Sequence, residues 1–279
     1  MGNLGVDTAV AGGDGRYEAT LSEDWRVWGP QGGYIASLAL RAAGLESGRP
    51  RPASINAHFC RAGTFDAVTI HARVLRSTRV ASFVDVEIHQ GEHLLLKASV
   101  WGVDEIDGLE HHTDERPGPL PDPEPIPSTA ERMADAGNPS YPFWGNLDCR
   151  SPFWIDDWEN RPPLQAVTGE WYRFVPQSRF DDPWVDACRS LVLIDVGSWP
   201  AAVRPHDDEL DYFAPTTEVT ARFIGDSRED EWLESWAWAP VATAGLIGAR
   251  GGVWTRDGRL VAVGGSTLLC RPAARRPTH

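Results

Sequence analysis

The 279-residue chain has no stretch of about 18 consecutive apolar residues, the length that a membrane-spanning helix needs. Its first residues also lack the basic segment and the apolar run of a secretory signal. Val6 stands where a myristoylation signal requires Ser or Thr, so the opening Met-Gly predicts no lipid anchor. These absences favour a protein that is neither exported nor inserted into a membrane, and we expect it in the cytoplasm.

Cysteine is scarce, and its spacing fits neither a zinc site nor a disulfide framework. The four cysteines lie dozens of residues apart, with no C-x-x-C pair: Cys60, Cys149, Cys188 and Cys270. We expect them to be reduced thiols. His111 and His112 are adjacent, an arrangement that does not readily place two imidazoles on one metal ion. We therefore expect no metal site.

Positive charge is also in short supply. Lys and Arg number 26 against 40 Asp and Glu, which gives a net charge of −14. A sequence-independent nucleic-acid binder must neutralise phosphates with a basic surface, so DNA and RNA are poor candidate partners. An anionic ligand would need a local group of cations. Arg76 and Arg79, on either side of a short polar turn, form one such group, although solvated strand-end charges need no ligand.

Proline, by contrast, is abundant and unevenly placed. Of the 22 prolines, 11 fall between residues 103 and 165, so we predict a Pro-rich connector at 103–163 that wraps over the surface. A floppy linker is the alternative reading. The Gly-rich residues 1–15 and the Pro/Arg-rich residues 272–279 predict a flexible N-terminus and a flexible tail, both outside the core.

The segments 16–102 and 164–271 have the same order of elements, because each contains a strand, then an apolar helix, then further strands. Hydrophobic patterning places the helices from Gly33 to about Leu45 and from about Val185 to Ser198. Further strands are predicted at 52–62, 66–76, 81–90, 93–102, 216–226 and 232–249, and a hairpin at 251–269 turns at Asp257 and Gly258. The sequence therefore predicts one duplicated unit.

Several short motifs occur in this order. The first repeat contains GPQGGYIASLALRAA, RPASINAHF and VLRSTRVASFVDVEIHQ, and the second contains EWYRFV, LVLIDV, PTTEVTARF and DGRLVA before LLCR. Their order and spacing resemble the acyl-CoA thioesterase II family. The resemblance implies an α+β double hotdog, with two antiparallel sheets that are each wrapped around a central helix. It also implies hydrolysis of acyl-CoA without a metal or redox cofactor, and association into a homodimer or a higher homo-oligomer.

In that family an Asp on the second-repeat helix, a Ser or Thr on the next strand and a Gln on the last strand hold the attacking water. Carried over by motif, the Asp is Asp195 and the hydroxyl is Thr216. The Gln position is Ser266, where this chain has no amide. Thr217 is an alternative to Thr216, because strict strand alternation places Thr217 on the inward face, and Thr216 can reach that face only through a bulge.

The position of Asp195 needs a physical reason. It falls near the end of its predicted helix, where the partial negative charge of the last turn opposes a carboxylate. A buried acid there needs hydrogen-bond donors, or carries a raised pKa that suits a general base. An exposed acid at a frayed helix end is the plain alternative.

Residues Gln31, Gly32 and Gly33 lead into the first helix, where free amides could form an oxyanion hole, although a tight turn alone could also require these glycines. Trp25 and Trp28, just before them, could line an acyl tunnel.

The resemblance implies that Arg76 and Arg79 contact the phosphates of coenzyme A. The predicted function is hydrolysis of acyl-CoA by water that Asp195 and a threonine activate. The alternative is a non-hydrolytic acyl-CoA or acyl-ligand binding protein that has lost the catalytic Gln at Ser266. A hotdog hydratase is a weaker reading, because neither helix shows an Asp and His pair.

Overall fold

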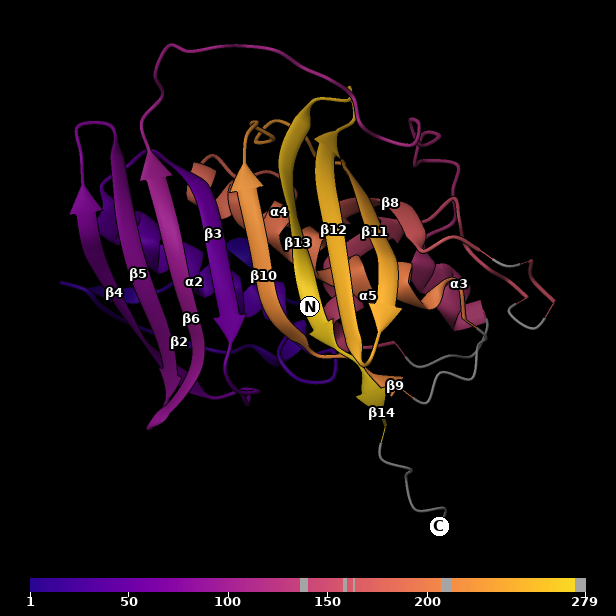
Figure 1. The fold of residues 1–279 in the computed structure, drawn as a ribbon, viewed down its shortest axis with the longest axis horizontal. Coiled ribbons are helices and arrows are strands. Elements are labelled where there is room, and N and C mark those ends of the chain that lie inside the picture. The colour runs from indigo at the N-terminus through magenta and orange to yellow at the C-terminus, as the bar shows by residue number, and fades with distance from the viewer. Residues whose placement is uncertain (136–139, 158–159, 163, 207–211, 274–279) are drawn as a thin grey trace.

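A computed structural model describes residues 1–135, 140–157, 160–162, 164–206 and 212–273 of the chain. These residues form one antiparallel sheet of 12 strands (Figure 1). In sheet order the strands are β1 (Ala11–Gly13), β2 (Arg16–Thr20), β4 (Ala67–Ser77), β5 (Ala81–Gln90), β6 (His93–Val103), β3 (Arg51–Phe59), β10 (Thr216–Phe223), β13 (Leu260–Leu269), β12 (Leu246–Thr255), β11 (Leu233–Thr243), β8 (Val167–Phe174) and β7 (Leu147–Arg150).

The strand order repeats in the two halves of the sheet. The first half runs β2-β4-β5-β6-β3 and the second, read inward from its outer edge, runs β8-β11-β12-β13-β10. In each set of five strands, the strand that is second in sequence, β3 or β10, lies innermost. The order of elements that the sequence predicted as a duplication is therefore present in the topology.

The two halves are joined by the pair β3 and β10, whose register places Ala57 opposite Val219 and Ile55 opposite Ala221. The expectation of two separate sheets is therefore wrong, since the backbone hydrogen bonds continue from one half into the other. These four side chains are buried, and small or branched residues at this seam let the helices behind it approach the sheet.

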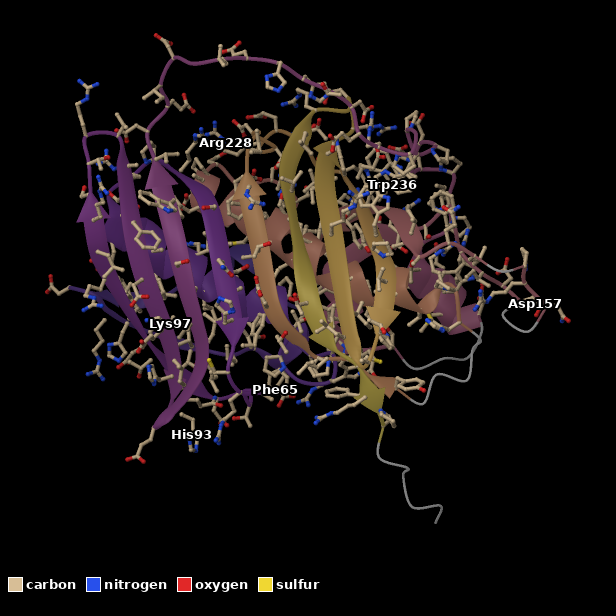
Figure 2. All side chains as sticks on the ribbon, viewed as in Figure 1. Phe65, His93, Lys97, Asp157, Arg228 and Trp236 are labelled. Carbon is tan, nitrogen blue, oxygen red and sulfur yellow. The ribbon has the colours of Figure 1, made fainter. Side chains whose placement is uncertain are left out.

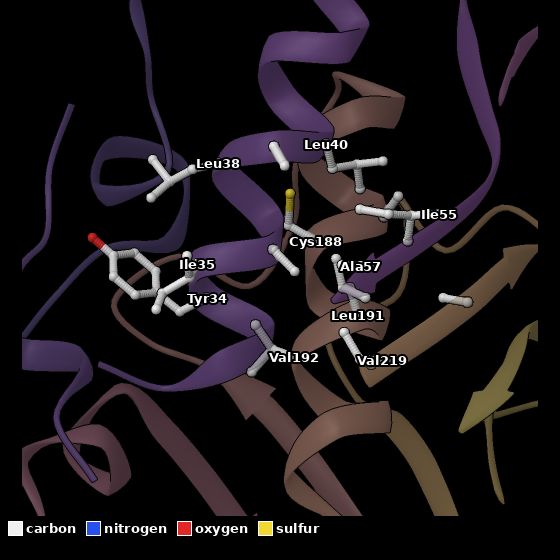
Figure 3. Packing of buried hydrophobic residues seen from close by; sticks show 14 of the residues in the cluster. Tyr34, Ile35, Leu38, Leu40, Ile55, Ala57, Cys188, Leu191, Val192 and Val219 are labelled. Carbon is white, nitrogen blue, oxygen red and sulfur yellow. The ribbon is translucent and has the colours of Figure 1, made fainter. Parts of the chain in front are cut away.

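Helices α2 (Gly32–Ser47) and α4 (Pro183–Val196) lie side by side on one face of the sheet. Their apolar side chains fill the core, and Figure 3 shows Leu38 and Leu40 of α2 with Leu191 of α4. Each buried leucine of this kind stabilises the fold by about 1.5–3 kcal/mol.

The helix pair is antiparallel, and close contacts mark its two ends. At one end a Cβ on Gly33 would meet the Val192 Cα at 2.7 Å, so glycine is needed for the helices to touch. At the other end the Trp184 ring lies against Gly44, where a Cβ would come within 2.7 Å of the indole.

The N-terminus differs from the expectation of a flexible, unpacked segment. Residues Leu4–Asp7 form the short helix α1, and Leu4 is only 2% exposed and belongs to the core. The Gly2 N–H donates to Asn146 Oδ1 at 2.7 Å. The expectation that residues 1–15 lie outside the core is wrong, because one apolar side chain and a backbone hydrogen bond hold the segment down. Most of the predicted tail, 274–279, lies outside the described residues.

Part of the connector covers the face of the second half opposite the helices, while its Phe143 lies in the core beside Trp25. It contains α3 (Thr129–Asp135), the 3-10 helix η2 (Pro142–Asn146) and β7. Its Leu120 packs on a cluster of tryptophans from strands and loops of that half: Trp171, Trp232, Trp236 and Trp254. Figure 2 places Trp236 beside the connector and Lys97 on the first half of the sheet.

A buried ion pair fixes the connector in place. Arg116 Nη1 donates to Glu234 Oε2 at 2.7 Å, and the Trp171 Nε1–H donates to the Pro121 carbonyl at 2.8 Å. These contacts attach the connector to β11 and β8 of the second half.

Helix α4 stops at Val196, and a second short helix α5 (Ser198–Val203) begins at once. Pro200 therefore lies in the first turn of α5, where proline is tolerated, rather than simply ending α4. The short strands β9 (Tyr212–Phe213) and β14 (Arg271–Pro272) pair with each other beside α5 and the start of β10. The remaining 3-10 helix is η1 (Glu23–Trp25). None of the helices in the described part of the chain is long and apolar enough to cross a membrane.

Candidate active site

Asp195 lies at the C-terminal end of α4, facing a cavity of about 850 Å³. The cavity opens at the end of the sheet where β3 finishes and β10 begins (Figure 1). Asp195 is only 7% exposed, so the alternative of a solvent-exposed acid at a frayed helix end is wrong. A carboxylate buried to this degree needs donors.

The first half of the chain supplies two of these donors. Gln31 Nε2–H donates to Asp195 Oδ2 at 2.6 Å, and the Gly33 backbone N–H donates to the same oxygen at 2.9 Å. Both donors stand at the N-terminus of α2, where the helix dipole is positive. The carboxylate that the end of its own helix disfavours is thus stabilised by the start of the neighbouring helix.

Gln31 is the N-cap of α2 as well. Its Oε1 accepts from the Tyr34 N–H at 2.6 Å, while its Nε2 donates to Asp195, so one amide spans the helix end and the acid. Gln31 is 3% exposed and lines the cavity. It was predicted among oxyanion or substrate-binding residues, and the structure places one of its two amide protons on the carboxylate.

The second half supplies the third donor. Thr216 Oγ1–H donates to Asp195 Oδ1 at 2.9 Å. The pairing of β10 with β13 shifts register between Thr216 and Glu218, which is the bulge that Thr216 requires to face inward. Thr217 Oγ1–H instead donates to the Thr267 carbonyl at 3.0 Å. Both threonines line the cavity, but among them only Thr216 reaches the carboxylate.

Ser266 stands on β13, opposite Val219 of β10. Its hydroxyl is buried and makes no hydrogen bond with the described residues, yet it lies close enough to Asp195 to lower the pKa of that acid. It does not line the cavity. Ser266 therefore lies on the sheet side of the Asp195 carboxylate, and Gln31 lies on its cavity side.

Burial raises the pKa of Asp195 above its ordinary value, and hydrogen bonds from Thr216 and Gly33, together with the nearby Ser266 hydroxyl, oppose that rise. Desolvation disfavours the charged carboxylate, whereas donors favour it. A carboxylate with a raised pKa that faces a wet cavity has the properties of a general base.

The two glycines at the start of α2, Gly32 and Gly33, have different roles. A Cβ on Gly32 would come within 2.8 Å of Asp195 Oδ2 and 3.1 Å of the Phe59 ring, so a side chain there would crowd the acid. Gly33 permits the helix contact described above, and its N–H is taken by Asp195. The N–H of Gly32 is bonded to no described residue, and Gly32 lines the cavity. Of the predicted oxyanion amides, Gly32 is the one left free.

Aromatic side chains form much of the cavity wall. Trp28 lies between Trp199 and Phe213, with ring centroids 6.1 Å and 4.6 Å away. Of the two tryptophans predicted to line an acyl tunnel, Trp28 lines the cavity, whereas Trp25 is fully buried and stacks on Tyr34. Trp199 comes from α5 and Phe213 from β9, and no local pattern in the sequence placed them at this site.

The predicted coenzyme A residues Arg76 and Arg79 do not lie at this cavity. Phe59, at the end of β3, lines the cavity. Eight residues earlier, at the start of β3, Arg51 pairs with Val103. Val103 in turn pairs with Ala81, which lies beside the Arg76–Arg79 turn. Eight residues of strand span about 26 Å. The turn is therefore at the opposite end of the sheet from Asp195. The sequence does not show which end of a strand faces the acid.

Within the described residues, no group of three or more His, Cys, Asp or Glu side chains has a metal-binding arrangement. Cys149 and Cys188 are buried, and burial raises the pKa of both thiols.

Comparison with known families gives two matches. The model of the acyl-CoA thioesterase N-terminal domain matches residues 21–103, and that of the acyl-CoA thioesterase C-terminal domain matches residues 115–267. No curated protein matches the chain by sequence.

Solved structures resemble the chain over almost its whole length. A protein of unknown function with a hot dog fold from Alicyclobacillus acidocaldarius is 18% identical, with a TM-score of 0.80 over 97% of this chain and 98% of that one. The acyl-CoA thioesterase II TesB2 of Mycobacterium marinum is 18% identical, with a TM-score of 0.75 over 99% of both chains. The tesB protein of Mycobacterium avium subsp. paratuberculosis is 19% identical, with a TM-score of 0.76 over 96% and 98%. At these identities the likeness concerns the hot dog fold.

Proposed function

The chain belongs to the acyl-CoA thioesterase family, and from that premise we propose that it hydrolyses acyl-CoA to a free acid and coenzyme A at Asp195. The observation that carries the proposal is the convergence of Gln31, Gly33 and Thr216 on one buried carboxylate at the floor of a cavity. We extend the proposal to the architecture, in which residues 16–102 and 164–271 are two hotdog units that share this site.

In this mechanism Asp195 acts as the general base. Its carboxylate takes a proton from a water molecule as the water oxygen attacks the carbonyl carbon of the thioester. Thr216 holds Oδ1 and offers its own lone pairs to the water. Gln31 and Gly33 keep Oδ2 oriented, so that the remaining acceptor sites of the carboxylate face the cavity.

The attack places negative charge on the former carbonyl oxygen. The free N–H of Gly32, at the positive end of α2, is the donor that we assign to this oxyanion, together with the second amide proton of Gln31. Collapse of the tetrahedral intermediate breaks the carbon–sulfur bond. The proton held by Asp195 then passes to the departing thiolate, which leaves as coenzyme A.

Ser266 supports a second candidate, a protein that binds acyl-CoA without hydrolysing it. Where the resembling family has a Gln on the last strand, this chain has a hydroxyl that makes no hydrogen bond to described residues and does not reach the cavity. Tight binding of acyl-CoA by titration calorimetry, without thiol release at any chain length, is the outcome that favours this candidate.

The test is a thiol-release assay with a panel of acyl-CoA esters, using the wild type, Asp195→Asn and Asp85→Asn. Asp195→Asn preserves the shape of the side chain but removes the base, so we expect turnover to fall at least 100-fold, the lower end of what general base catalysis contributes (roughly 10²–10⁴). Asp85, which pairs with Lys97 on the first half, serves as the matched carboxylate control and should keep full turnover. Unchanged turnover by Asp195→Asn, with an active wild type, overturns the assignment of the base.

Homo-oligomerisation is a separate part of the proposal. Light scattering of the purified chain measures it directly, and a monomer mass at micromolar concentration contradicts it.

A further inference from the structure

The charged residues that line the cavity are distributed unevenly. Of the lining residues that the structure describes, three carry charge: Asp195 on the floor, and Arg61 and Arg271 among the exposed residues of the wall. A chain with a net charge of −14 thus has a cavity whose exposed charged side chains are both positive.

Both arginines are held by local structure. Arg61 follows β3, and its N–H donates to the Leu95 carbonyl at 3.3 Å. Arg271 pairs with Phe213 across β14 and β9, and its guanidinium lies 5.5 Å from the centre of that ring. Both therefore have backbones fixed by neighbouring strands.

Neither guanidinium has a described carboxylate within ion-pair distance. Several arginines of the second half do have one, as in the pairs of Arg228 with Asp226 and of Arg256 with Glu124. An arginine kept beside a cavity without a carboxylate partner is available to bind an anionic ligand.

The two arginines also stand at a suitable separation. Arg61 follows the end of β3 and Arg271 follows the end of β13, and these strands are separated in the sheet by β10 alone. Strands two positions apart lie about 10 Å from each other. Two long guanidinium side chains at this spacing can approach one extended polyphosphate from both sides.

We propose that Arg61 and Arg271 form the site for the phosphate groups of coenzyme A. This inference rests on the proposed function and deepens it. With the phosphates at the arginines, the pantetheine arm runs inward and presents the thioester to Asp195. The acyl group then lies along the aromatic wall of Trp28 and Trp199.

The experiment compares Arg61→Gln, Arg271→Gln and the double variant with the wild type on two substrates that share one acyl group. One substrate is acyl-CoA, and the other is the N-acetylcysteamine thioester, which has no phosphate. Each single change should raise KM for acyl-CoA about three- to tenfold, with roughly multiplicative effects in the double variant. KM for the N-acetylcysteamine thioester and kcat for both substrates should stay unchanged.

Arg222→Gln is the matched control, because this exposed arginine lies on β10 and does not line the cavity. The variants of Arg61 and Arg271 should also weaken the binding of free coenzyme A in calorimetry, and added salt should reduce the difference from the wild type. Equal changes on both substrates, or an effect of Arg79→Gln as large as that of Arg61→Gln, overturn the inference.

The design separates the two proposals. Hydrolysis of both thioesters with no selective effect of the arginines overturns the phosphate site alone. If neither thioester is hydrolysed, the proposed function is overturned. The calorimetry with coenzyme A then still tests whether Arg61 and Arg271 bind its phosphates.

Discussion

Changing Gln31 to serine isolates the contact between the two halves of the site. The Gln31 side chain does two things, because its oxygen caps α2 through Tyr34 and its nitrogen donates to Asp195. Serine is a good N-cap residue but is too short to reach the carboxylate. Gln31→Ser therefore removes the amide donor and keeps the helix start, so at low pH, where Asp195 is protonated, the melting temperature should change little.

The expected magnitude follows from the geometry of that contact. The donor and acceptor are 2.6 Å apart, one partner is charged, and the two residues are 3% and 7% exposed. A hydrogen bond to a charged group contributes about 1.5–3 kcal/mol. Its loss destabilises the ionised form of Asp195 only, which moves the acid limb of the pH–rate profile upward by about one to two pH units.

The assay is the pH dependence of kcat for thiol release between pH 5 and 9, followed beside the wild type and Gln177→Ser. Gln177 is an exposed glutamine that donates to the Arg179 carbonyl away from the cavity, so its profile should match the wild type. A profile of Gln31→Ser that coincides with the wild type refutes the assignment of Gln31 as a donor to the working carboxylate. A fall in activity that is equal at every pH refutes it as well, since the loss would then not act through ionisation.

Three further predictions concern stability and the neighbouring donors. Because burial raises the pKa of Asp195, the folded state disfavours the ionised form of this acid. The resulting loss of stability is absent below the ordinary carboxyl pKa and grows as pH rises through the raised pKa. Asp195→Asn should therefore melt higher than the wild type at pH 8 and no higher at pH 4, and a lower melting temperature at pH 8 would contradict this. Thr216→Val should lower kcat about tenfold or more while Thr217→Val stays near the wild type, and similar losses in both would contradict the separate roles given to the two hydroxyls. Gly33→Ala should destabilise the fold by about 1–3 kcal/mol in urea denaturation, because its Cβ would meet the Val192 backbone, and an unchanged midpoint would show that the helices can shift apart.

Much of the fold was predictable because its signals are local. Helix α2 starts one residue before the predicted Gly33, and the hairpin turns at Asp257 and Gly258, where Gly258 has a positive φ of 88°. The pairing of β3 with β10 was not predictable, because hydrophobic alternation says which face of a strand is buried and not which strand lies beside it. The turn at Ala244 and Gly245, which divides the predicted 232–249 strand, was also missed.

The site was predictable only in part, for the same reason. The residues Asp195 and Thr216 were assigned through the resemblance to the thioesterase family, and the structure places their side chains in contact. The contact of Gln31 with Asp195 spans 164 positions in sequence. Such a contact depends on how two helices dock, and a single sequence contains no signal for it. Arg61 escaped notice because the structure alone shows that the chain leaving β3 passes the cavity.

The packing of Trp184 on Gly44 makes the start of α4 different from the start of α2. The paired helices are related end for end, so the start of α4 would be the second place for an acid to meet a helix N-terminus. There the Trp184 indole lies against Gly44, and the Trp184 backbone N–H donates to Asp182, the N-cap of α4 itself, at 2.8 Å. Under the proposed function, the described residues therefore form one reaction centre per chain, with donors from both halves of the sheet.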